Sequence, residues 1–216
     1  MTKPATAAPA PQQARSRATL ERLLVATIQT LDAGGLDAAV VPAIALRAGV
    51  APASIYRRFR DKDALLRAAF LHVLELSHQG NRERLPRLLL RPTLDASARR
   101  LVALVLAQYR QHPQLLRALT RFIEADAGGA FAREAQARMA HNVDLMIEVL
   151  MPFRAEIAHR SPRRALRFAL LTLFGAAEAY ALEAASLWHT APRISAKEFA
   201  TELARAFIAY LRTPVR

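Results

Sequence analysis

The chain has 216 residues, of which 53% are hydrophobic, and it carries 31 Lys and Arg against 18 Asp and Glu. This length is enough to bury a core, in one domain or in a small unit joined to a larger one. The chain contains no cysteine, which excludes a disulfide scaffold, a thiolate zinc site and a cysteine nucleophile. With only 7 glycines among many Ala, Leu and Arg, the composition favours an all-α protein.

The formal net charge of +13 fits a protein that binds nucleic acid, because clustered basic side chains displace counterions from a phosphate backbone. The first 80 residues hold ten basic and six acidic side chains, so most of the positive excess lies further along the chain. The charge is therefore compatible with nucleic-acid binding but does not locate it.

Neither the N-terminal segment nor the most apolar stretch predicts a membrane or secretory protein. The first 13 residues are rich in Ala and Pro and lack the basic-then-apolar order of a secretory signal, so residues 1–16 are predicted to form a tail. The apolar stretch from Ala165 to Leu187 carries Arg167, Glu178 and Glu183, which are costly inside a bilayer. We expect an interior helix there, no membrane contact and a cytoplasmic protein.

Apolar residues three and four positions apart predict an amphipathic first helix from Thr19 to Ala33. Gly34 and Gly35 follow it, and glycines in this position end a helix because they adopt left-handed backbone conformations without strain.

Two short helices are predicted next, separated by a tight turn. The first covers Val41 to Ala48 and ends at Gly49, and the second begins around Ala51 and Pro52 and continues to Phe59. Ile55 and Phe59 lie four residues apart on one face of the second helix, which we expect to pack inward.

A fourth helix is predicted to begin after Asp61, a favourable N-cap residue, with Asp63 in its first turn. Proline and glycine breaks divide the rest of the chain into further helices, about nine in all. These are expected near residues 94–111, 114–124, 129–151, 162–189 and 195–212.

Three consecutive segments form the most specific motif in the sequence. They are Ile44–Val50, with its Ala-Gly-Val turn, then Ala51–Phe59, and then Asp61–Leu66 with its Lys-acid-Ala-Leu-Leu pattern. Together they resemble the helix-turn-helix of the TetR family of bacterial transcription regulators, and the resemblance extends from about Leu20 to Phe70. In such a motif the glycine lets two helices cross closely, so that the second can lie in the major groove of DNA.

The resemblance implies that the helix beginning at Pro52 reads DNA. It implies that Ser54, Tyr56 and Lys62 contact phosphates, while Arg57 or Arg58 pairs with a guanine. The residues expected to bind DNA are Pro52, Ala53, Ser54, Tyr56, Arg57, Arg58 and Lys62.

The sequence departs from the family pattern at several of these helix boundaries. Val40 and Ala51 stand where the family usually places a capping Ser or Thr, and each missing cap costs about 1 kcal/mol of local helix stability. Arg57 and Arg58 replace a frequent aromatic residue and histidine. These changes bear on the operator sequence and on the phosphate contacts.

The resemblance also implies a division into a DNA-binding domain at residues 17–62 and a helical effector-binding and dimerisation domain at residues 63–216. Small and apolar residues on the last two long helices predict half of a four-helix bundle between two copies of the chain, which suits a palindromic DNA site. The expected homodimer interface contains Leu170, Phe174, Ala177, Phe199, Leu203 and Phe207.

An effector pocket is expected between the body helices, for a small hydrophobic molecule and with no cofactor or metal. The candidates are the aromatic and methionine side chains that fall on these helices, together with one histidine as a polar anchor. They are Tyr109, Phe122, Met139, His141, Met146, Phe168 and Trp188.

These features favour a repressor that the effector releases from a palindromic operator, through a shift of the fourth helix. An activator that uses the same parts is an alternative. A helical interaction module that has lost DNA binding is another, although Ser54, Tyr56 and Lys62 argue against it. Catalysis is disfavoured because the chain lacks a glycine-rich phosphate loop, a His-Glu-x-x-His motif and a nucleophile elbow.

Overall fold

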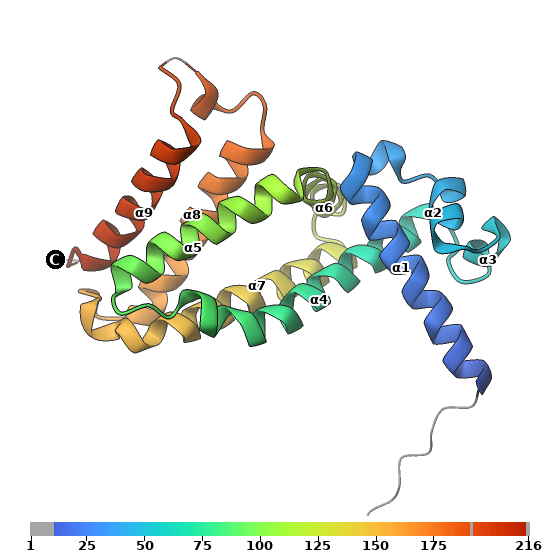
Figure 1. The fold of residues 1–216 in the computed structure, drawn as a ribbon, viewed down its shortest axis with the longest axis horizontal. Helices are drawn as coiled ribbons and strands as arrows, with labels where there is room; N and C mark the ends of the chain where they lie inside the picture. Colours follow the sequence, from blue (N-terminus) through green and yellow to red (C-terminus); the bar gives the residue numbers. More distant parts are fainter. Residues whose placement is uncertain (1–10, 191, 215–216) are drawn as a thin grey trace, which may run out of the picture. The chain divides into compact units, whose positions relative to one another are not determined.

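A computed structural model describes residues 11–190 and 192–214, and this part of the chain is helical with no β-strand. The all-α prediction is thereby confirmed. The helices form two compact units, one extending to His72 and the other beginning at Val73, and the helix α4 (Lys62–Leu89) contributes to both. The two units are described separately below (Figure 1).

The first unit contains α1 (Pro11–Ala38), α2 (Val41–Ala48), α3 (Pro52–Tyr56) and the beginning of α4. The first helix starts earlier than predicted, at Pro11, within the expected tail. Its opening residues, rich in Ala, Gln and Arg, are good helix formers that need no apolar stripe. The rest of the expected tail, residues 1–10, lies outside the described residues. The boundary predicted between residues 62 and 63 stays a prediction.

The glycine pair interrupts the helical backbone of α1 where the sequence predicts that the helix ends. Gly34 and Gly35 have non-helical backbone angles, with φ of +66° at Gly35, so the helix is kinked there before it continues to Ala38. The predicted end at Ala33 is therefore a kink followed by one further short helical segment.

The helix α2 has the predicted bounds, and Gly49 ends it. Gly49 has φ of +65° and ψ of 41°, and the next residue's amide closes the turn by donating to the carbonyl of Ala45 at 3.0 Å. This is the left-handed C-cap that glycine favours. As the sequence implies, neither Val40 nor Ala51 supplies a side-chain cap to the helix that follows it.

The second unit completes the chain with α5 (Leu94–Gln111), α6 (Pro113–Ala125), α7 (Ala130–Leu150), α8 (Pro162–Leu182) and α9 (Ala196–Arg212). Short 3-10 helices follow two of them, η1 (Met151–Glu156) and η2 (Leu187–His189). The core lies where α5 packs on α8 and α9, and α7 packs on α8 (Figure 1).

The predicted helix at residues 162–189 is too long, because α8 ends at Leu182. Glu183 is extended, and the segment that follows has no large apolar side chain until Leu187. By length and composition α8 is apolar enough to cross a membrane, but Leu166, Leu170 and Leu173 on it are buried in the core of the second unit. Its apolar character is thus partly that of a core helix.

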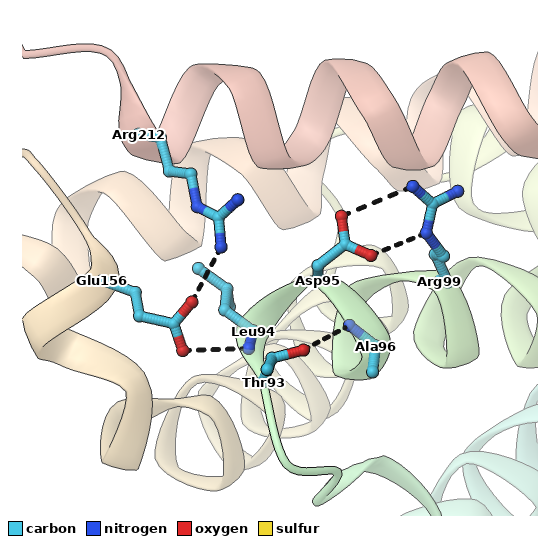
Figure 2. Close-up of polar contacts among 7 residues, drawn as sticks. All are labelled: Thr93, Leu94, Asp95, Ala96, Arg99, Glu156 and Arg212. Carbon is cyan, nitrogen blue, oxygen red and sulfur yellow. Dashed lines mark hydrogen bonds and ion pairs between the residues drawn. The ribbon is translucent and has the colours of Figure 1, made fainter.

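A polar cluster joins three elements at one end of the second unit (Figure 2). The Glu156 carboxylate accepts a hydrogen bond from the backbone amide of Leu94, the first residue of α5, at 3.1 Å. It also pairs with the Arg212 guanidinium from the last turn of α9 at 2.8 Å. A carboxylate is favourable at a helix N-terminus, where amides have no intrahelical partner. Glu156 therefore ties η1 to both α5 and α9.

Two glycine substitutions should have opposite effects on stability. An added Cβ would meet no atom within 4 Å at either Gly49 or Gly80, so only the backbone conformation decides. Gly49→Ala forces alanine into the left-handed region and should lower the free energy of unfolding by about 1 kcal/mol. Gly80→Ala, inside α4, should raise it by about 0.5–1 kcal/mol.

Urea unfolding of both variants measures these changes. Gly49→Asn is the matched control, because asparagine tolerates the left-handed region, and it should lose less stability than Gly49→Ala. Equal losses in these two variants would contradict the explanation from backbone conformation.

Candidate nucleic-acid interface

The helix α3 has one buried side chain and an exposed remainder. Ile55 is fully buried, as are Ile44 of α2 and Leu65 of α4. A single side chain of α3 is therefore buried in the core of the first unit. Pro52, Ala53 and Tyr56 are exposed, and 57% of Tyr56 is accessible to solvent. The helix therefore presents two small residues and a phenol outward while Ile55 fixes its position.

The helix ends earlier than predicted, at Tyr56. The amides of Arg58 and Phe59 both donate to the Ile55 carbonyl at 2.9 Å, and this shared acceptor closes the last turn. Phe59 is half-buried after the helix end, so its inward direction agrees with the prediction although it lies outside α3.

The two adjacent arginines have different partners. The Arg57 guanidinium donates to Ser54 Oγ at 2.9 Å, one helical turn back on the same exposed side of α3. The Arg58 guanidinium instead donates to Ser16 Oγ at 3.0 Å, on α1. Arg58 is therefore directed toward the first helix, whereas Arg57, the residue after α3, turns back onto the exposed side of α3.

A cleft of about 510 Å³ lies between α1 and the α2–α3 turn. Three guanidiniums line it, from Arg22, Arg57 and Arg58, together with the hydroxyls of Thr19 and Ser54. It contains no acidic side chain. Such a set of donors suits a phosphate oxygen, because charge-assisted hydrogen bonds from arginine are strong and directional.

Sequence reasoning missed Thr19 and Arg22 as parts of this surface. They lie three residues apart on α1, a spacing that puts them on one side of the helix, and that signal was present in the sequence. The contact of Arg58 with Ser16 joins residues 42 positions apart, and no local pattern indicates it.

The start of α4 is built as predicted. Asp61 accepts a hydrogen bond from the Ala64 amide at 2.7 Å, and this bond is the main reason that the pKa of Asp61 is lowered, with Arg60 contributing. Lys62, the first residue of α4, is half-buried. The N-cap thus fixes the helix end that carries Lys62.

The structure does not gather the residues expected to line an effector pocket. Met146 is in the core, and Tyr109 packs against the core. Met139, His141, Phe168 and Trp188 are exposed, and Phe122 lies edge-on to Phe131 with ring centres 6.3 Å apart. These residue types were selected for their apolar character, which places them equally well in a core or against a neighbouring side chain.

The expected dimer residues are also placed differently. Leu170, Ala177, Phe199 and Phe207 are buried in the core of their own chain, and Phe174 and Leu203 are partly buried against it. The prediction selected the apolar stripe of each helix, and that stripe is the one that packs inside the protomer.

No three His, Cys, Asp or Glu side chains within residues 11–190 and 192–214 are grouped so that they could hold a metal ion. What the structure does offer is a two-helix crossing at a glycine turn, with a second helix that exposes small and hydroxyl groups and is followed directly by two arginines. This arrangement defines a helix-turn-helix protein that binds DNA.

Residues 23–69 match the family model of the bacterial regulatory proteins of the tetR family. The chain is thus a DNA-binding transcriptional regulator whose N-terminal part belongs to the TetR family, and the resemblance stated above is confirmed. A comparison with curated proteins found no match.

Solved structures share the whole fold. A structure assigned to the TetR family of transcriptional regulators, from Mesorhizobium loti MAFF303099, is 19% identical, with a TM-score of 0.64 over 94% of this chain and 98% of its own. The reduced form of NemR from E. coli is 18% identical, with a TM-score of 0.63 over 92% and 100%. FadR from Bacillus subtilis, in complex with stearoyl-CoA, is 14% identical, with a TM-score of 0.60 over 91% and 99%.

The stability of the second unit should depend on pH through Tyr109. Burial, and then the charge of Glu178, raise the pKa of Tyr109 to about 12. A tyrosine in the unfolded chain ionises near pH 10, so between about pH 10 and pH 12 the unfolded state releases a proton that the folded state retains. The stability from Tyr109 is therefore complete below about pH 10 and is lost as the pH rises toward 12.

Urea unfolding of the wild type and of Tyr109→Phe, at about pH 9 and about pH 11, measures this effect. The wild type should lose more unfolding free energy than the variant over that range. Phenolate absorbance should show that the variant lacks the last step of tyrosine ionisation. Equal losses in the two proteins would contradict the assignment.

Proposed function

We propose that this protein is a homodimeric repressor that binds a palindromic operator in the cytoplasm and is released by a small effector. The observation that carries the proposal is the exposed face of α3, held in place by the buried Ile55. A regulator, in contrast to an enzyme, needs no catalytic group on that face. It needs small side chains, hydroxyls and cations; α3 presents the first two, and Arg57 and Arg58, which directly follow it, supply the cations.

The different partners of the two arginines suggest different roles on DNA. Arg57, directly after α3, turns back to Ser54 on the exposed side of the helix, where a guanidinium can reach the edge of a guanine in the major groove. Arg58 is directed toward α1 and shares a cleft with Arg22 and Thr19, where it is suited to a backbone phosphate. Arg57 is the proposed base reader, and Arg58 is the proposed phosphate ligand.

The remaining residues expected to bind DNA fit the same division. Ser54, Tyr56 and Lys62 supply a hydroxyl, a phenol and an ammonium group for phosphates, which fix the position of the protein on the duplex. Pro52 and Ala53 are small and exposed, so they allow close approach to the bases, and alanine can contact a thymine methyl group.

The proposed dimer interface is the outward face of α8 and α9, because the stripe that the sequence suggested is used inside the protomer. Phe168 and Leu171 on α8 are 57% and 55% exposed, and Phe168 lies 5.1 Å from the Tyr210 ring on α9. Gly175, one turn beyond Leu171, leaves room for a second helix. A second copy would remove these apolar groups from water and hold two reading helices one DNA turn apart.

Effector sensing is supported by the larger helical unit and by the fold shared with FadR, whose structure contains stearoyl-CoA. An effector can release the repressor only if it binds the DNA-free state more tightly. It must then weaken DNA binding by the same factor by which DNA weakens effector binding.

Replacing each arginine separately tests the division of roles on DNA. Arg57→Ala should relax selectivity at one base pair of the operator by about 1–3 kcal/mol. Arg58→Ala should weaken binding to all sequences alike and reduce the slope of log affinity against log salt by about 1. Fluorescence anisotropy with an operator and with single-base variants, over a series of salt concentrations, measures both quantities.

A double variant, Arg22→Ala with Arg58→Ala, is the matched control, and it should reduce the salt slope further without altering base preference. If Arg58→Ala changed the preferred base while Arg57→Ala did not, the roles proposed here would be reversed.

The interface between two copies is tested by charge. Leu171→Glu places a carboxylate on the proposed contact face and should convert a dimer into a monomer, because an unpaired charge is costly to bury. Leu76→Glu, on an exposed position of α4, is the control and should leave the dimer intact. Light scattering after size-exclusion chromatography gives the mass in each case, and a dimer that survives Leu171→Glu would refute this interface.

A further inference from the structure

The second unit contains a cleft of about 580 Å³ between α6 and the C-terminal end of α8. This volume lies within the range of small-molecule sites. Its polar lining includes Arg117, Thr120, Arg121 and Glu124 from α6, with Glu178 from α8 and Glu183 just after α8. None of the apolar residues expected to form an effector pocket lines it. Three carboxylates and two guanidiniums face one another across a single cleft.

Glu178 is the most informative of these side chains. It is half-buried, and its Oε1 atom accepts a hydrogen bond from Thr120 Oγ1 at 2.8 Å. Within residues 11–190 and 192–214 no ion pair is formed by Glu178, and its second oxygen retains its capacity to accept hydrogen bonds. A carboxylate that is partly removed from water without a cation is costly, and a cationic ligand would offset that cost.

Glu178 also influences a side chain on α5. Its negative charge is the second cause, after burial, of the raised pKa of Tyr109 on α5. The Glu178 carboxylate therefore lies close enough to the packed side chains of the second unit to influence a tyrosine there.

The end of α8 holds Arg117 in place at the cleft. Its last carbonyls have no intrahelical partner and carry the negative end of the helix dipole. Arg117 donates from Nε to one of them, the Leu182 carbonyl, at 2.8 Å, which fixes the guanidinium at the cleft. The terminal amino groups of Arg117 remain donors for an anionic group, and Arg121 lies one turn further along α6.

We infer that this cleft binds a small zwitterion, whose ammonium group lies against Glu178 and Glu183 and whose carboxylate is bound by Arg117 and Arg121. The inference rests on the proposed function, in that it names the chemical class of the effector. It also replaces the hydrophobic effector that the sequence suggested, because a wholly apolar ligand would bring no cation to the Glu178 carboxylate.

Three probes of equal chain length separate the charges: 6-aminohexanoate, hexylamine and hexanoate. Binding is measured by saturation-transfer NMR with the full-length protein. The single tryptophan, Trp188, lies three residues beyond the cleft residue Ala185 and gives a second signal by fluorescence. We expect 6-aminohexanoate to bind best and hexanoate to bind worst.

Variants identify the groups responsible. Glu178→Gln keeps the shape and the acceptor for Thr120 but removes the charge, and it should weaken both amine probes about tenfold, the contribution of one charge-assisted hydrogen bond. Arg117→Met should remove the advantage of 6-aminohexanoate over hexylamine. Glu202→Gln, on an exposed position of α9, is the matched control and should change nothing. Thermal unfolding by circular dichroism verifies that each variant is folded.

The inference is overturned if hexanoate binds as well as the amines, if no amine probe binds at millimolar concentration, or if Glu178→Gln binds them unchanged. Operator binding is measured in parallel without probe. Loss of ammonium-dependent binding with operator binding intact refutes the cleft assignment alone. Absence of operator binding with probe binding intact refutes the proposed function alone.

Discussion

The burial of Ile55 is the interaction on which the reading surface depends. A helix of five residues is not stable on its own, and α3 has no side-chain cap at its start. Ile55 is its one fully buried residue, so packing at this position holds the exposed face in a defined orientation. Gly49 makes this packing possible, because its left-handed backbone lets α3 cross α2 after a turn of only three residues. The DNA-binding surface is thus held in place by packing on the buried side of α3.

The second unit combines an apolar core with polar side chains placed where helices end. Glu156 joins the start of α5 to the end of α9, and Arg117 satisfies a carbonyl at the end of α8 (Figure 2 shows the first of these). In both cases a charged side chain satisfies backbone groups that the helix itself leaves without partners. Glu178 differs from these two side chains, because its carboxylate accepts a hydrogen bond from a hydroxyl and pairs with no cation among the described residues.

Much of the fold was predictable from the sequence, since glycine, proline and capping residues mark helix ends by local chemistry. The bounds of α2 and α5 agree with the prediction, and Asp61 caps α4 as expected. The early start of α1 was not predictable from periodicity, because its first turns carry no apolar stripe. The early end of α3 depends on the Ile55 carbonyl, which accepts two amides, and that of α8 on the extended backbone of Glu183. Neither feature has a local sequence signal.

The candidate sites were likewise predictable only where local sequence determines the position of a side chain. The outward side chains of α3 follow from the inward position of Ile55, so periodicity indicated them. The hydrogen bond between Arg58 and Ser16 joins residues 42 positions apart, and the one between Thr120 and Glu178 joins residues 58 positions apart. Only the tertiary structure brings these residues together. Residue type alone was a poor guide to the effector site, because methionine and aromatic side chains fill cores as readily as they line pockets.

We propose that α3 reads a specific DNA sequence as part of a symmetric dimer. Selection of binding sites from random DNA by the purified full-length protein tests it most directly, with a Tyr56→Ala, Lys62→Ala double variant in parallel. We expect a palindromic consensus with half-sites about one helical turn apart, which the variant fails to enrich. A folded wild-type protein that enriched no sequence at low salt, where phosphate contacts are strongest, would contradict it.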